Sequence, residues 1–314
     1  MSASTVLKSL SFSFALMACF LGSYCPAAVF DSFDPSVHSR FLANGDVNPA
    51  FFVPESSITG VAGDPSDPDN RAVLITPFHY LTAGHVSEFS PMFRGSDGVL
   101  RTYTGTTFVD LTTNAGTVTG GSDLRLVRLD APIPAAHGVT PLALLDGNPS
   151  DIIGQELTVF TAGNLAGRNV IDNIVISSFA GGTSPTFAVQ YGFDTATNGG
   201  TGGLGADEVG LTGGDSGHAA LVQIGDEFAV VGTHFGIDIS MGQVPSAGDQ
   251  YNSFTSLVTP YLDEIDSITQ ADGFSVRTLS VSAVPEPAHW IFVLGIGLAL
   301  VTFRKRRATA HASV

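Results

Sequence analysis

Lysine and cysteine are nearly absent from this chain. The shortage of cysteine limits disulfide bonds, and the shortage of lysine limits basic surface patches. Lysine occurs only as Lys8 and Lys305, close to the two ends. The 2 cysteines, Cys19 and Cys25, both lie near the N-terminus. If that N-terminal segment is removed, the remaining chain can form no disulfide, and we expect its stability to come from burial alone. Residues 29–284 are numerous enough to bury a sizeable core.

Basic residues of either kind are scarce in that central part. The whole chain has 13 Lys+Arg and 29 Asp+Glu, but residues 29–284 hold only 8 of the basic and 28 of the acidic residues, a net charge near −20. Nucleic acids and anionic membranes attract proteins through basic patches. We therefore expect neither nucleic acid nor an anionic membrane surface to be a partner of this body.

The first residues have the pattern of an export signal. Lys8 precedes an apolar stretch over 10–21, and small residues follow up to Ala27 and Ala28. A charge, a short apolar core and small residues in this order are typical of a secretory signal peptide. We predict a signal peptide over residues 1–28, cleaved after Ala27 or Ala28. A lipoprotein cleavage site before Cys19 is the alternative.

Residues 285–314 have the pattern of a second targeting signal. The apolar stretch over 290–303 has 14 residues, and four basic residues follow it at 304–307. A free-standing membrane span needs roughly 20 residues. Because arginine side chains can reach the membrane interface, the stretch can still form a single thin transmembrane helix with the body outside the cell. A buried core helix is the alternative.

This tail carries a resemblance to a known sorting signal. Val284-Pro285-Glu286-Pro287, the apolar stretch and the arginine-rich end together resemble the PEP-CTERM sorting signal. The resemblance implies recognition by an exosortase-like processing enzyme and cleavage near the Pro-Glu-Pro motif. It also implies transient membrane association through the hydrophobic helix, followed by release to the cell surface or the extracellular space.

Between the two predicted targeting signals, the sequence has the pattern of an all-β domain. Short apolar runs rich in β-branched residues are separated by Gly, Pro and Asn, which favours a barrel or sandwich of many short strands. We expect an irregular N-terminal segment over 29–57, a domain over 58–272 and a linker over 273–284. The glycine-rich run over 199–205 should be a mobile loop. The clearest expected strands lie at 72–75, 98–100, 124–129, 157–160 and 228–231.

One helix is expected near the end of this domain. Thr259 can cap its N-terminus, and Pro260 suits its first position. Asp263 and Glu264 would complement the helix dipole in the first turns. The expected buried stripe consists of Val258, Tyr261, Leu262 and Ile265.

The run Gly213-Gly214-Asp215-Ser216-Gly217 places a serine in a tight glycine turn. A serine hydroxyl is a weak nucleophile unless a neighbouring base accepts its proton. Flanking glycines let the backbone fold sharply and bring N–H groups toward one point, where an oxyanion can be held. Ser216 is therefore a candidate nucleophile, and an inert loop serine is the alternative.

A base and an orienting carboxylate can be proposed from two other motifs. His85 lies in a glycine turn with Gly84, a short distance after the expected strand that contains residues 73–75, and the pKa of a histidine, near 6.5, suits a general base. Asp123 precedes a strand that should be largely buried, so its carboxylate can pair with a ring N–H. A plain turn histidine at 85 is the alternative, as is Asp110 or Asp97 in the place of Asp123.

These motifs, in this order, resemble the trypsin/chymotrypsin-like serine proteases. The matching motifs are Thr-Ala-Gly-His at 82–85, Asp-Leu-x-Leu-Val-x-Leu from 123 and Gly-Asp-Ser-Gly at 214–217, and the similarity spans about 58–268. The resemblance implies two six-stranded antiparallel β-barrels with a short C-terminal helix. It implies His85 as general base, Asp123 as the orienting carboxylate and Ser216 as nucleophile. The N–H groups of Gly214 and Ser216 would form the oxyanion hole, and no cofactor would be needed.

The resemblance also carries expectations about Asp215 and the substrate pocket. Asp215 would pair either with a freed N-terminal amine, which Ile58 faintly resembles, or with internal donors. The pocket would involve Gly210 and Leu211, where no acid stands, so a preference for Lys or Arg is not expected. His234, in the segment with Phe235 and Gly236, falls on a histidine that glutamyl endopeptidases use to hold an acidic side chain. A preference for an acidic residue before the scissile bond is therefore one hypothesis, and a packing role for His234 is the alternative.

The sequence predicts a secreted or surface-sorted serine endopeptidase that acts on protein or peptide substrates. An inactive protease-like module that binds at a surface or matrix is the main alternative, and an esterase with the same triad is a weaker one. His218 is interpreted as structural, and no metal site is predicted. The loop with Asp64, Asp67 and Asp69 can be either a calcium site or, more simply, an acidic solvated turn.

Overall fold

The computed structural model describes part of the chain, with short gaps. Both cysteines, the predicted tail over 285–314 and all of the predicted signal peptide except Ala28 lie outside the described residues. The described residues up to Ser280 belong to one structural unit, and Val281 belongs to a second. No helix within the described part is both long and apolar enough to cross a membrane. The described residues are 28–281 except 68–69, 88–89, 116–117, 179–183, 197, 201–202 and 240–242.

The segment that precedes the main sheets contains only short elements, and a buried arginine fastens it to the domain. These elements are β1 (Val29–Phe30), α2 (Pro35–His38) and η2 (Glu55–Ser57). Arg40 is almost completely buried. Its guanidinium donates to both carboxylate oxygens of Glu55, at 2.9 and 2.8 Å, and to the carbonyls of residues 61 and 62.

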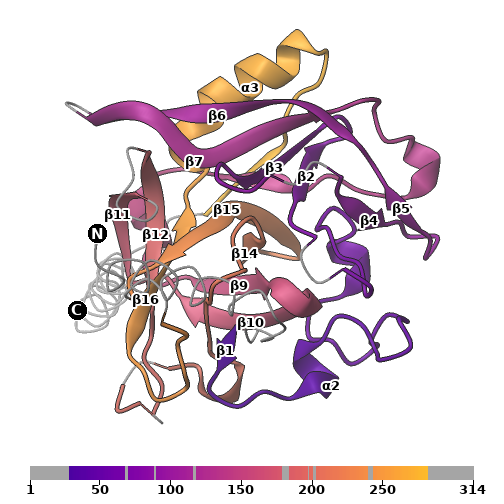
Figure 1. Ribbon diagram of the computed structural model, residues 1–314. Coiled ribbons are helices and arrows are strands. Elements are labelled where there is room, and N and C mark those ends of the chain that lie inside the picture. The colour runs from indigo at the N-terminus through magenta and orange to yellow at the C-terminus, as the bar shows by residue number, and fades with distance from the viewer. Residues whose placement is uncertain are drawn as a thin grey trace, which may run out of the picture. The chain divides into compact units, whose positions relative to one another are not determined.

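The first half of the domain forms a four-stranded antiparallel sheet in the order β2-β3-β7-β6. A separate hairpin, β4 with β5, lies between β3 and β6 in the chain. In Figure 1 the four-stranded sheet lies above β9, β10 and β14. The bounds are β2 Val73–Thr76, β3 His79–Ala83, β4 Met92–Arg94, β5 Leu100–Thr102, β6 Gly105–Ala115 and β7 Val118–Leu129.

The second half forms a nine-stranded sheet, in which seven strands follow the order β10-β9-β14-β15-β16-β12-β11. β8 joins this sheet beside β15, and β17 pairs with β8. β13 pairs with β1 in a small sheet of its own. The bounds are β8 Ala143–Asp146, β9 Glu156–Thr161, β10 Leu165–Val170, β11 Asn173–Ser178, β12 Pro185–Phe193, β13 Val209–Gly210, β14 Ala219–Ile224, β15 Glu227–Ile237, β16 Tyr251–Ser256 and β17 Thr278–Ser280.

The structure confirms a mostly-β chain with one short helix at its C-terminal end, but the strand pairing differs from two six-stranded antiparallel barrels. The main ladders contain four and nine strands. Two of the strand pairs are parallel: β8 pairs with β15 and with β17 in the parallel direction. β17 also falls inside the expected linker over 273–284, so part of that linker belongs to the sheet.

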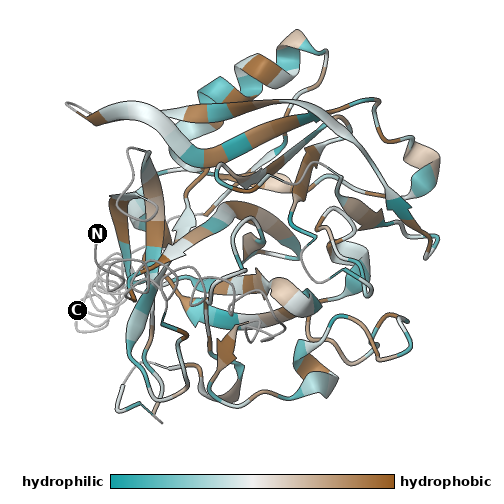
Figure 2. Cartoon of the chain, in the orientation of Figure 1, coloured by the Kyte–Doolittle hydropathy of each residue, from teal (hydrophilic) through white to brown (hydrophobic). Residues whose placement is uncertain are grey.

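The helix at the C-terminal end is α3 (Leu262–Ala271), preceded by the single turn η8 (Thr259–Tyr261). Tyr261 and Ile265 are buried as predicted, while Leu262 is half-buried. Figure 2 shows hydrophobic and hydrophilic residues alternating along α3. Thr259 was expected to cap the helix, but its hydroxyl donates instead to the carbonyl of Leu145, at 3.1 Å.

Candidate active site

His85 and Asp123 form a hydrogen-bonded pair at the end of the four-stranded sheet. β3 and β7 are paired so that Ala83 lies opposite Leu124, which brings the residues just beyond β3 next to Asp123. The backbone N–H of His85 donates to Asp123 Oδ1 at 2.8 Å, and His85 Nδ1 lies 2.7 Å from Oδ2. The Asp123 side chain is 4% exposed and the His85 side chain 26%. Gly84 is required here, because a Cβ at residue 84 would lie 2.9 Å from Asp123 Oδ1.

The backbone of Asp123 is held from both sides. Its carbonyl accepts from the N–H of Gly84 at 3.0 Å. Its own N–H donates to the hydroxyl of Thr186 at 2.7 Å, and Thr186 is fully buried on β12 of the other sheet. With His85 Nδ1–H held by a carboxylate, Nε2 of a neutral ring is left as the proton acceptor, which is the tautomer that a general base needs.

The two alternative carboxylates are occupied elsewhere. Asp110 accepts from Arg125 Nε at 2.6 Å, and Asp97 pairs with Arg101 at 2.7 Å. Arg125 also donates to the carbonyl of Val86 at 3.0 Å, which fixes the loop just after His85. Of the three aspartates considered from the sequence, Asp123 is the one that the structure joins to His85.

The turn that carries Ser216 packs against the His85 loop. Gly217 has φ +87°, and its N–H donates to the carbonyl of His234 at 2.8 Å. A Cβ at residue 217 would lie 2.7 Å from Thr82 Oγ1 and 3.4 Å from a methyl group of Val86. Since Thr82 and Val86 flank His85 in the chain, Ser216 belongs to the same corner of the molecule. Among the described contacts, no hydrogen bond joins the Ser216 hydroxyl to His85, and such bonds are often long in ligand-free enzymes.

The N–H groups around Ser216 are divided into two kinds. Those of Asp215, Gly217 and His218 donate to backbone carbonyls. Among the described residues, those of Gly214 and Ser216 donate to none. Gly214 has φ +111°, a conformation that favours glycine. Two backbone donors without an internal acceptor, on either side of one residue, can stabilise an oxyanion.

Asp215 is fully buried and is held by internal donors. Its carboxylate accepts from the N–H of Thr212 at 2.6 Å and from the N–H of Ala162 at 2.9 Å. Burial raises the pKa of Asp215 to about 6, while these hydrogen bonds and the charge of Arg71 act in the opposite direction. The N–H of Ile58 donates to the carbonyl of Glu55 at 3.1 Å. Of the two partners considered for Asp215, the internal donors are the ones present.

Four of the five residues expected to line the substrate pocket are buried inside the protein. Gly210 pairs with Val29, and a Cβ at residue 210 would collide with the hydroxyl of Tyr251. Leu211 is 1% exposed, and its carbonyl accepts from that hydroxyl at 2.9 Å. Phe235 is also 1% exposed, while Gly236 is half-buried. The aromatic ring of Tyr251 therefore occupies the space beside Gly210.

His234 was considered either as a histidine that holds an acidic substrate side chain or as a packing histidine, and the structure gives its ring partners inside the protein. Nε2 donates to the carbonyl of Phe160 at 2.9 Å, and Nδ1 lies 2.6 Å from the hydroxyl of Thr255. The residue is fully buried. Burial lowers its pKa to about 3, and the neighbouring His218 acts in the same direction. Because the ring is neutral and both of its nitrogens are already hydrogen-bonded, it has no free N–H to donate to a substrate carboxylate. These contacts agree with the alternative that His234 packs inside the protein.

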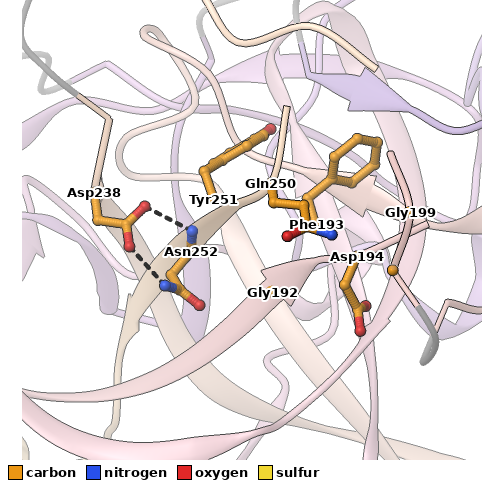
Figure 3. A pocket seen from close by; sticks show the side chains of 9 residues that line it. Gly192, Phe193, Asp194, Gly199, Asp238, Gln250, Tyr251 and Asn252 are labelled. Carbon is orange, nitrogen blue, oxygen red and sulfur yellow. Dashed lines mark hydrogen bonds between the residues drawn. The ribbon is translucent and has the colours of Figure 1, made fainter. Parts of the chain in front are cut away.

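An open pocket that sequence reasoning missed has Tyr251 among its lining residues. Its volume is about 430 Å³, and it contains two carboxylates, of Asp194 and Asp238, but no basic residue. Figure 3 shows Asp238 bonded to the backbone and side-chain nitrogens of Asn252. Asp194 and Asp238 each directly follow a strand, which was the available sequence signal. The pocket is lined by Gly192, Phe193, Asp194, Gly199, Gly200, Asp238, Gln250, Tyr251 and Asn252.

The acidic loop considered for calcium has a turn structure. Asp64 is buried, and Oδ1 accepts from both the N–H and the hydroxyl of Ser66 at 2.8 Å. Asp69 lies outside the described residues. Within the described ranges, no group of three or more His, Cys, Asp or Glu side chains is arranged to hold a metal ion.

Comparison with known proteins gives structural matches alone. No family model matches the sequence, and no curated protein does. Among solved structures, the chain is similar to kallikrein-related peptidase 10, with 15% identity and a TM-score of 0.41, over 67% of this chain and 99% of that one. It is also similar to the NS6 protease from murine norovirus 1, with 13% identity and a TM-score of 0.37, over 65% and 93% of the two chains. Since both scores are below 0.5, we base the functional proposal on the contacts of this chain.

Proposed function

We propose that this protein is a serine endopeptidase of the trypsin-like kind, with His85, Asp123 and Ser216 as its catalytic triad. The observation that carries the proposal is the buried Asp123 carboxylate, bonded to both the backbone and the ring of His85, beside a glycine turn that holds Ser216. The four-stranded sheet supplies the base and the carboxylate. The nucleophile comes from the loop before β14 of the nine-stranded sheet, so the proposed site lies between the four-stranded and the nine-stranded sheet.

The proposed reaction proceeds through an acyl-enzyme. Ser216 Oγ attacks the carbonyl carbon of the scissile peptide bond while His85 Nε2 accepts the hydroxyl proton. The N–H groups of Gly214 and Ser216 hold the oxyanion, and each such donor typically contributes about 3 kcal/mol to the transition state. His85 then gives its proton to the leaving amine as the C–N bond breaks. Water, activated by the same ring, hydrolyses the ester and frees Ser216.

We propose no preference for an acidic residue before the scissile bond, because His234 is buried and both of its ring nitrogens are hydrogen-bonded inside the protein. We retain the proposal that the protein is exported through residues 1–28 and sorted through 285–314 by an exosortase-like enzyme. Terminal sequencing of the secreted protein tests this processing. A mature chain that still begins at Met1, or that keeps its tail after release from the membrane, would contradict the respective part.

An inactive protease-like binding module is the second candidate. Two observations favour it: the Ser216 hydroxyl makes no hydrogen bond to His85 among the described contacts, and Tyr251 fills the space beside Gly210. Both arrangements can change when a substrate binds.

Hydrolysis assays separate the candidates. We expect the mature protein to cleave an unstructured protein such as casein and a panel of chromogenic peptides, and Ser216→Ala to abolish this. Cleavage of nitrophenyl esters without any peptide cleavage would indicate an esterase with the same triad. No difference between the wild-type protein and Ser216→Ala on either substrate would overturn the enzymatic proposal.

A further inference from the structure

A small polar cavity lies where the loop before β2 meets strand β3. Its volume is about 10 Å³. Tyr80 belongs to β3, which leads directly into Gly84 and His85. Arg71 also lines the cavity, and its Cβ would lie 3.0 Å from a Cβ at Gly217. Its lining residues therefore contact or adjoin both parts of the proposed catalytic site, the strand that leads to His85 and the turn that holds Ser216. The lining residues are Asp67, Asn70, Arg71, Tyr80, Ser90 and Pro91.

Two buried polar groups in these walls have no partner in the described protein. Tyr80 is 0% exposed and its hydroxyl makes no hydrogen bond. Asn70 is 5% exposed and its side-chain Nδ2 makes none either, although Oδ1 accepts from the N–H of Met92 at 3.1 Å. Buried donors in native proteins are almost always satisfied by protein or by bound water. Two such groups that line one cavity point to a shared ligand.

We propose that one structural water molecule occupies this cavity, accepting a hydrogen bond from Asn70 Nδ2 and bonding to the Tyr80 hydroxyl. The volume agrees, because one water needs roughly 10–15 Å³ of such space and two to four polar partners. Burial raises the pKa of Tyr80, so its hydroxyl keeps its proton at neutral pH and can donate. A metal cation does not fit, because the Asn70 amide presents N–H hydrogens, and a larger ligand exceeds the volume.

The water would connect the loop that carries Asn70 and Arg71 to the strand that carries Tyr80. It would thereby help to fix β3, whose last residues set the position of His85. Only this consequence for His85 rests on the proposed function. The water site itself depends on Asn70 and Tyr80 and stands if the protein proves to be catalytically inactive.

The substitution Tyr80→Phe tests the proposal by the sign of its effect on stability. With the water present, the variant loses one satisfied hydrogen bond, and we expect the equilibrium constant for unfolding to rise about 2- to 10-fold. With a dry cavity, the variant loses an unsatisfied buried hydroxyl, and the constant stays the same or falls. The latter result would overturn the proposal. Tyr251→Phe is the matched control, because that hydroxyl donates to the Leu211 carbonyl at 2.9 Å, and its loss must raise the constant in either case.

A high-resolution crystal structure of the wild-type protein decides the question even if Tyr80→Phe fails to fold. We expect a spherical density peak within hydrogen-bonding distance of both Tyr80 Oη and Asn70 Nδ2. An empty cavity, or a rotation of either side chain onto a protein partner, would overturn the proposal. Neither experiment involves catalysis, so failure here leaves the endopeptidase proposal untouched, and the reverse also holds.

Discussion

Replacing His234 by glutamine should change how the stability of this protein depends on pH. The imidazole is fully buried, and its nitrogens contact the Phe160 carbonyl and the Thr255 hydroxyl. A carbonyl can only accept, so Nε2 carries the proton, and Nδ1 of the neutral ring accepts from Thr255. A glutamine amide offers one donor group and one acceptor but does not titrate in this range.

The size of the effect follows from the pKa of the ring. Burial lowers the pKa of His234 from 6.5 to about 3. Between these two pH values, His234 is protonated in the unfolded chain but not in the folded chain. Its contribution to the free energy of unfolding is therefore fully present above pH 6.5 and is lost as the pH falls toward 3. Each pH unit inside that window removes about 1.4 kcal/mol, and the whole window corresponds to about 5 kcal/mol.

Urea unfolding of the wild-type protein and His234→Gln between about pH 7.5 and pH 4.5 measures this difference. Asp215 acts in the opposite direction: its pKa is raised to about 6, so its contribution is present below 3.8 and is lost as the pH rises through about 6. Because both proteins keep Asp215, its contribution cancels in the comparison between them. We expect the stability of the wild-type protein to fall relative to His234→Gln as the pH decreases.

The control substitution is His137→Gln, at a half-buried histidine whose ring meets the hydroxyl of Tyr103 at 2.9 Å. Parallel curves of stability against pH for the wild-type protein and His234→Gln would show that burial does not lower the pKa of His234. They would mean that His234 titrates as an accessible histidine, and the hypothesis of an acidic substrate preference would regain its physical basis.

Three further substitutions test other parts of the structure. Arg40→Ala leaves the Glu55 carboxylate without its bidentate partner and should destabilise the fold by about 3–5 kcal/mol in urea unfolding, whereas a loss near zero would contradict the fastening role. Gly217→Ala combines an unfavourable φ of +87° with contact to Thr82, so it should cost more stability than Gly225→Ala, which has φ +63° and no nearby atoms. Asp123→Asn should lower kcat/KM on a peptide substrate about 10⁴-fold by favouring the wrong tautomer of His85, and a loss below tenfold would contradict its orienting role.

The sequence was informative where function depends on neighbouring strands. His85 and Asp123 each sit beside an apolar run, and the pairing of β3 with β7 then brings them together. The mostly-β class and the short helix at the C-terminal end were also predicted, because hydrophobic runs, glycine turns and Pro260 are local signals.

What the sequence missed depends on contacts between distant parts of the chain. The His234 ring bonds to Phe160, 74 residues away, and the Thr259 hydroxyl bonds to Leu145, 114 residues away. Neither side chain reveals locally whether it meets solvent or another strand. The same holds for Tyr251, whose ring covers the position beside Gly210 only because β13 and β16 come together in the fold.

Labelling by a fluorophosphonate probe shows whether Ser216 is an activated nucleophile. The mature, folded protein should gain one adduct, located on Ser216 by peptide mass mapping. Labelling should disappear in Ser216→Ala and fall sharply in His85→Ala. The absence of an adduct on Ser216 in the folded wild-type protein, or labelling of His85→Ala as fast as that of the wild-type protein, would rule out the proposed triad.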